Sequence, residues 1–70
     1  MEEKLNKIRE VVNLFGEGAF YSIDITNYGI RYQGYINRDS IQIAEDAGYT
    51  KEKTEKFLVY NKDVSRLTFV

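Results

Sequence analysis

Four carboxylates have the side-chain type that best suits acid–base chemistry: Asp24, Asp39, Glu45 and Asp46. Arg31 and Tyr35 could support them as polar neighbours. General acid–base catalysis needs a carboxylate whose pKa is shifted by burial or by a charged partner. Each of these acids falls on an expected solvent-facing position or helix cap, where its charge stays hydrated. The pattern therefore indicates solvated charge, and we expect a protein that is not an enzyme.

The composition narrows the possible sites further, because the 70 residues include neither histidine nor cysteine. Disulfides, thiolate zinc sites and histidine-assisted nucleophiles are thereby removed, and we expect no metal and no cofactor. A net charge of −1 does not favour nucleic acid. No apolar run approaches the roughly 20 residues of a membrane span, and the acidic N-terminus is unlike a signal peptide. We expect a cytoplasmic protein without membrane contact.

The segment Ala19–Asn37 is rich in β-branched and aromatic residues, which predicts a β-hairpin. We expect its turn at Tyr28 and Gly29, and a four-residue loop, Asn27–Ile30, is an alternative with the same pairing. One face is then apolar and the other polar, as a half-buried antiparallel pair requires. The predicted partners are Ile25 with Tyr32, Ile23 with Gly34 and Tyr21 with Ile36 on the apolar face, and Thr26 with Arg31, Asp24 with Gln33 and Ser22 with Tyr35 on the polar face.

The polar face of this hairpin is the predicted surface for binding another protein, because tyrosine and arginine are common anchors of interfaces. The competing interpretation is an ordinary hydrated sheet face. An edge strand could also pair with a second copy of the chain, giving a homodimer. The candidate partner-binding residues are Asp24, Thr26, Tyr28, Arg31, Gln33 and Tyr35.

The N-terminal segment Glu2–Phe15 has the periodicity of an amphipathic helix that ends at Gly16. The apolar stripe comprises Leu5, Ile8, Val11, Val12, Leu14 and Phe15. We expect this stripe to cover the apolar face of the hairpin, burying Ile23 and Ile25 in a two-layer core. A glycine inside a strand usually marks a close approach, so we expect a helix to pack over Gly34.

A second helix is predicted over Ser40–Ala47, with Asp39 as its N-cap and Gly48 after its end. A second hairpin is expected to follow, with its turn at Asn61–Asp63. Its strands would place Phe57 and Val59 on the same face as Leu67 and Phe69. The predicted fold is α+β in two layers, with the N-terminal helix packed on an antiparallel sheet, in the order α-β-β-α-β-β. The alternative, α-β-β-α-α-β, makes Lys51–Tyr60 a helix, and a single domain over residues 1–70 is expected in both cases.

Residues 40–59, SIQIAEDAGYTKEKTEKFLV, resemble the helix-turn-helix pattern of bacterial and phage DNA-binding regulators. Ile43 and Ala44 match its apolar and small positions, Gly48 matches the turn glycine, and Thr50 matches the cap of its recognition helix. The resemblance implies a transcriptional regulator as the alternative function, and only then a nucleic-acid partner. The DNA-contacting residues would be Tyr49, Thr50, Lys51, Lys53 and Lys56.

In size and character, the whole chain is similar to small phage-encoded proteins that block host enzymes or defence complexes, including anti-CRISPR proteins. That similarity implies a non-enzymatic protein-binding module that acts by occlusion, in the cytoplasm of a host cell. This is the function we expect from the sequence.

Overall fold

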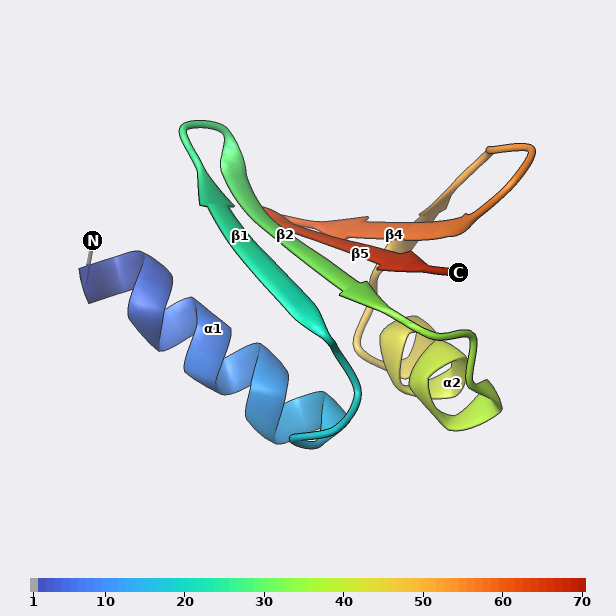
Figure 1. The fold of residues 1–70 in the computed structure, drawn as a ribbon, viewed down its shortest axis with the longest axis horizontal. Helices are drawn as coiled ribbons and strands as arrows, with labels where there is room; N and C mark the ends of the chain where they lie inside the picture. Colours follow the sequence, from blue (N-terminus) through green and yellow to red (C-terminus); the bar gives the residue numbers. More distant parts are fainter. Residues whose placement is uncertain (1) are drawn as a thin grey trace.

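The computed structural model describes residues 2–70, and these residues form two helices and five strands (Figure 1). The architecture is α+β, with the N-terminal helix packed on a sheet as predicted, although one strand more is formed. In chain order, the elements are α1 (Glu2–Phe15), β1 (Ser22–Thr26), β2 (Gly29–Gly34), α2 (Arg38–Asp46), β3 (Thr50–Glu52), β4 (Leu58–Lys62) and β5 (Ser65–Phe69).

The five strands form one mixed sheet in the order β1-β2-β5-β4-β3. The central pair, β2 and β5, is parallel, and the three other pairs are antiparallel. The prediction of a wholly antiparallel sheet is therefore wrong. The chain leaves β2, passes through α2, β3 and β4, and returns beside β2 in the same direction, as a parallel pair requires.

Both helices lie on the same side of the sheet, below it in Figure 1, and α1 has the predicted bounds. Its stripe is centred on Val11 and Phe15, which are buried, whereas Leu5 and Leu14 at its borders are exposed. Gly16 follows α1 with a φ of 97°, a conformation that glycine adopts without steric penalty, and its N–H donates to the carbonyl of Val12 at 2.8 Å.

The core lies between the helices and the three central strands. Phe20, in the connection between α1 and β1, joins the layers, with its ring centroid 5.3 Å from that of Phe15 and 5.2 Å from that of Tyr32. Such tilted aromatic pairs add to the free energy gained from burial alone. The buried core residues are Val11, Phe15, Ile30, Tyr32, Ala44, Tyr60, Leu67 and Phe69.

The first hairpin pairs in a register two residues away from the predicted one. Ile25 lies opposite Ile30 and Ile23 lies opposite Tyr32, so Asn27 and Tyr28 form the turn. The side chain of Thr26 explains the difference, because its Oγ1 accepts from the N–H groups of Tyr28 and Gly29, both at 3.1 Å. A slip of two residues leaves every side chain on its predicted face.

The expected burial of the apolar hairpin face is confirmed for β2 and wrong for β1. Ile30 and Tyr32 are buried, but Ile23 and Ile25 remain 37% and 41% exposed. The reason is position in the sheet, since β1 is an edge strand and α1 packs against β2 and α2.

Gly34 has a close neighbour, as expected, but that neighbour is not a helix. A Cβ at this position would overlap the carbonyl oxygen of Ala19 and crowd the ring of Phe20. The connection from α1 to β1 therefore lies against Gly34, and the prediction of a helix there is wrong.

The helix α2 begins earlier than predicted, and its N-cap is Asn37 rather than Asp39. The Asn37 side-chain oxygen accepts from the N–H of Asp39 at 2.8 Å and from that of Ser40 at 3.4 Å. Gly48, with a φ of 87°, follows the C-cap Ala47 as predicted. Asn37 has the extended backbone that a cap needs, whereas Asp39 already lies in the first turn.

Replacing Asn37 by alanine is expected to lower the free energy of unfolding by about 1 kcal/mol, because two N–H groups of the first turn lose their acceptor. The matched control is Asp39→Ala, which removes only a charge near the helix N-terminus, worth about 0.3 kcal/mol and screened by salt. Urea unfolding of both variants measures the two values. A larger loss for Asp39→Ala would contradict the assignment of the cap.

The C-terminal hairpin forms, with a face assignment opposite to the predicted one. Leu58 lies opposite Phe69 and Tyr60 lies opposite Leu67, so Leu58 and Tyr60 share the core face with Leu67 and Phe69. Val59 points to the other side. The turn is Asp63 and Val64, because Lys62 pairs with Ser65, and Asp63 takes a positive φ of 52° there. The predicted turn, Asn61–Asp63, begins two residues too early.

Candidate functional site

Neither helix lies on the other face of the sheet (Figure 1), where most side chains are exposed or half-buried and Val59 is buried. We call it the open face. The strand pairing brings side chains from all five strands onto it in two rows. The first row is Asp24, Arg31, Arg66, Asn61 and Thr50, and the second row is Ser22, Gln33, Thr68, Val59 and Glu52.

Two arginines lie side by side at the centre of the open face. Arg31 and Arg66 are register partners on the parallel strands β2 and β5. An acid flanks each of them, with 3.7 Å between Arg31 Nη2 and Asp24 Oδ2, and 3.0 Å between Arg66 Nη2 and Glu52 Oε2. Across the sheet, the charged side chains therefore follow in the order Asp24 (negative), Arg31 (positive), Arg66 (positive) and Glu52 (negative). Asn61 donates to the same Glu52 side chain at 3.3 Å.

Both arginines line each of two hollows on the open face, of about 340 Å³ each. The first hollow extends to the hairpin turns, where Tyr28 and Val64 form part of its wall. The second extends toward the loop between β3 and β4, where Phe57 and Val59 form part of its wall. The hollows and the arginine pair thus make a groove along β2 and β5. Two arginines, each paired with an acid, lie at its centre, and its walls hold both apolar and polar residues.

An aromatic cluster lies where β1 begins and β2 ends. The rings of Tyr21 and Tyr35 lie 4.9 Å apart, and Tyr35 is 71% exposed. Val70 donates its N–H to Gly34 and accepts from the N–H of Ile36, both at 2.9 Å, which places it beside Tyr35. Exposed aromatic and aliphatic side chains in one cluster are typical of protein interfaces.

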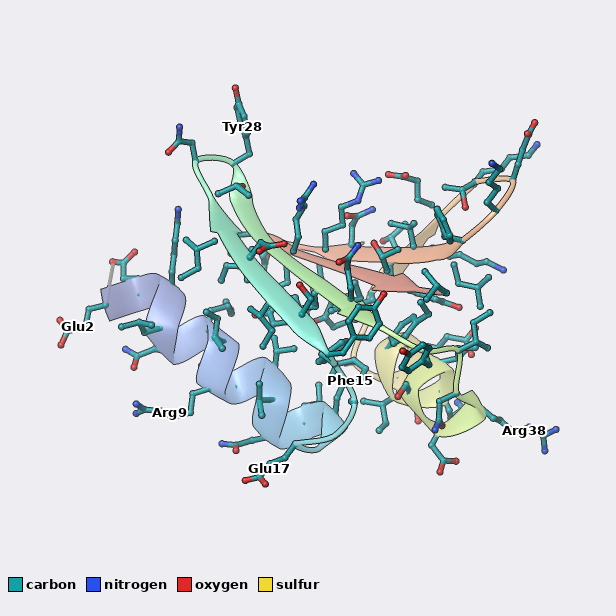
Figure 2. All side chains as sticks on the ribbon, in the orientation of Figure 1. Glu2, Arg9, Phe15, Glu17, Tyr28 and Arg38 are labelled. Atoms are coloured by element: carbon teal, nitrogen blue, oxygen red, sulfur yellow. The ribbon has the colours of Figure 1, made fainter. Side chains whose placement is uncertain are left out.

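The structure brings together some of the predicted partner-binding residues and separates others. Asp24, Arg31 and Gln33 share the open face. Thr26 uses its hydroxyl within the turn, where it accepts from two N–H groups and donates to the carbonyl of Gly29. Tyr28 is 97% exposed at the tip of the hairpin, pointing away from the helices (Figure 2).

The sequence alone does not identify the residues of β3, β4 and β5 that complete the open face. Arg66, Thr68 and Glu52 join the first hairpin because β5 pairs with β2, a contact between segments more than 30 positions apart. Alternation along the last strand places Arg66 and Thr68 on one face, and that pattern was the available signal. No local signal identifies the parallel neighbour of β2.

Residues 51–60 do not form the recognition helix that the helix-turn-helix resemblance implies. Thr50–Glu52 and Leu58–Lys62 are strands, and the loop between them is held by a hydrogen bond from Thr54 Oγ1 to the carbonyl of Phe57. The alternative order with a third helix is therefore wrong. The five residues predicted to contact DNA lie before, on and after the edge strand β3: Tyr49, Thr50, Lys51, Lys53 and Lys56.

A group of tyrosine hydroxyls lies under the other face of the sheet. Burial raises the pKa of Tyr32, and the neighbouring Ser65 hydroxyl offsets part of that rise without a well-formed hydrogen bond to the Tyr32 hydroxyl. Burial also raises the pKa of Tyr49, which the charges of Asp63 and Glu10 raise further.

The third tyrosine with a raised pKa is Tyr60. Its pKa is raised by burial first and by the charge of Glu45 on α2 second. These groups are core side chains, and nothing about their placement gives them access to a ligand on the open face.

Within residues 2–70, no group of three or more acidic side chains is arranged to hold a metal ion. The same part of the chain contains no helix with the length and hydropathy needed to cross a membrane. Comparisons with protein families, with curated proteins and with solved structures found no match to this chain.

Proposed function

We propose that the protein is a non-enzymatic protein-binding module whose working surface is the open face. The observation that carries the proposal is a five-stranded sheet with one side covered by two helices and the other side free of helices. Antiparallel sheets often leave one face in water, but this face also carries a groove, and an exposed aromatic cluster lies at the end of the sheet where β1 begins. Tyrosine and arginine are enriched at energetically important interface positions.

The proposed function includes no catalysis, because the acids of the open face form ion pairs with arginines. Asp24 and Glu52 each neutralise an arginine at the exposed surface. Acid–base catalysis needs a carboxylate held in a dry or strongly coupled setting, which this exposed ladder of charges does not offer.

In biological terms, we propose an inhibitor of the type that phages encode, which covers the working surface of a host protein in the cytoplasm. Occlusion needs only a rigid face of adequate size, and the sheet supplies that rigidity. The predicted pairing of an edge strand with a second copy applies to β1 or β3 and stays a prediction.

Capture from a bacterial lysate tests the proposal, with bound proteins quantified by mass spectrometry. We expect Tyr35→Ala combined with Phe57→Ala to reduce capture of the partner at least about tenfold, because aromatic anchors dominate interface energies. The matched control combines Leu5→Ala with Leu14→Ala, which removes equally exposed apolar side chains from α1. Capture that survives the first pair and is lost with the second would show that the partner binds the helical side.

A further inference from the structure

The arginine pair at the centre of the groove carries an inference about what the open face binds, and this inference rests on the proposed function. Like charges directly opposite each other on neighbouring strands disfavour the sheet. Arg31 and Arg66 occupy such positions, and the ion pairs with Asp24 and Glu52 lie at the exposed surface. Exposed pairs contribute about 0–1 kcal/mol, so they compensate weakly for the juxtaposition.

We propose that Arg31 and Arg66 jointly bind one carboxylate, from an aspartate or glutamate in an extended segment of the partner protein. A guanidinium has five N–H donors in a planar fork that matches a carboxylate. Each ion pair is made through a single nitrogen of its arginine, Nη2, so other donors remain for a second acceptor. Both arginines line both hollows, and an acidic side chain in the groove is therefore within reach of the pair.

The charges beside the pair indicate a single acid rather than a polyanion. Asp24 lies on one side of the arginines and Glu52 lies on the other, and Asp63 lines the first hollow at the β4–β5 turn. A nucleic-acid backbone along the face would bring phosphates against these acids, whereas a single carboxylate placed between the arginines makes fewer such contacts. The described basic residues of the open face are limited to Arg31 and Arg66, which is too few for the electrostatic binding that phosphate chains require.

The groove walls add a sequence preference for the bound segment. Alternate residues of an extended chain point to the same side, so residues two positions before and after the acid face the groove with it. They would meet Tyr28 and Val64 at one end, and the exposed Phe57 at the other. The expected pattern is an acidic residue with an apolar residue two positions away on either side.

A displayed library of random peptides, selected on the intact protein, tests the inference. Peptides of about ten residues, at about 3.3 Å per extended residue, reach the 32 Å length of the protein. We expect the selected peptides to share one acidic residue and to shift the amide signals of Gln33, Thr68 and Val59 in NMR spectra. Replacing that acid by its amide should weaken binding about tenfold, as for the loss of one charged hydrogen bond.

Three double variants separate charge recognition from general disruption. Arg31→Gln with Arg66→Gln should abolish binding of these peptides, whereas Arg9→Gln with Arg38→Gln, on the exposed surface of the helices, should leave it unchanged. Asp24→Asn with Glu52→Gln should tighten binding severalfold, because the competing acids are neutralised.

The outcomes distinguish this inference from the proposed function. Three results would overturn the carboxylate site and leave the open face as the interface. The peptides could bind the open face without an acid, or they could bind equally well after loss of both arginines. Their binding could also weaken when the two acids are neutralised. Peptides that shift only the signals of α1 and α2 would overturn both. Failure to select any peptide would overturn the inference, because a groove with a built anchor should retain short segments.

Discussion

Replacing Phe69 by alanine is expected to lower the free energy of unfolding by about 3–5 kcal/mol, the loss typical of a phenylalanine removed from a core. Phe69 is fully buried and packs against Phe20 and Tyr60. A domain of this length has about 4–10 kcal/mol in total, so the variant should be largely unfolded or close to it. Chemical denaturation followed by circular dichroism measures the change, and Phe69→Leu should retain most of the stability.

The matched control is Phe57→Ala, because sequence alternation placed both phenylalanines on the same face. Phe57 lies on the open face and is 47% exposed, so its removal should cost about 1 kcal/mol or less. Equal losses for the two variants would mean that β4 and β5 are paired as the sequence suggested and that the observed register is wrong.

Alkaline unfolding is expected to be unusually steep, because the pKa values of Tyr32, Tyr49 and Tyr60 are all raised above the ordinary value of 10.0. Below pH 10 the three hydroxyls are protonated in both states, and their contribution to stability is fully present. Above pH 10 the unfolded chain loses these protons first, so stability falls until the pH passes the folded-state values. No single hydroxyl can add more than about 1.4 kcal/mol per pH unit, and the enclosed Tyr32 hydroxyl should contribute more than that of the half-buried Tyr49.

The variant Tyr32→Phe should remove the largest single share of this slope, since it deletes the titrating group that is fully enclosed. It should leave stability at neutral pH unchanged or raised, because the enclosed Tyr32 hydroxyl has no hydrogen-bond partner among the described residues. Tyr28→Phe is the control, and its exposed hydroxyl should leave the slope unchanged. Urea midpoints measured at intervals from pH 8 to about pH 12 give the slope. A slope that Tyr32→Phe does not reduce would contradict the burial of that hydroxyl.

Local patterns in the sequence were sufficient for much of the fold. The periodicity of α1 and the glycine after it predict the helix bounds, because both are set by neighbouring residues. The alternation in β2 predicts which of its side chains are buried, and a slip in register of two residues does not alter it. The side chains that contribute to a hairpin turn were harder to predict, and the role of Thr26 was missed.

The candidate site was predicted only where it lies within one hairpin. Asp24, Arg31 and Gln33 follow from alternation in β1 and β2, but the other half of the open face depends on the parallel pairing with β5. Whether a strand such as β1 lies at the edge also depends on the whole sheet. For this reason the local pattern predicts burial of Ile23 and Ile25, which are exposed. Both features arise from contacts between distant segments, and neither has a local signature.

The most direct test of the open face is the direction of the β2–β5 pairing in solution, because that pairing places Arg31 beside Arg66. Nuclear Overhauser contacts between backbone protons of the two strands report it. We expect contacts that advance together along both strands, from Ile30 with Ser65 to Gly34 with Phe69. Contacts that run in opposite directions, or that are missing while β4 and β5 still pair, would contradict the groove and the function proposed for it.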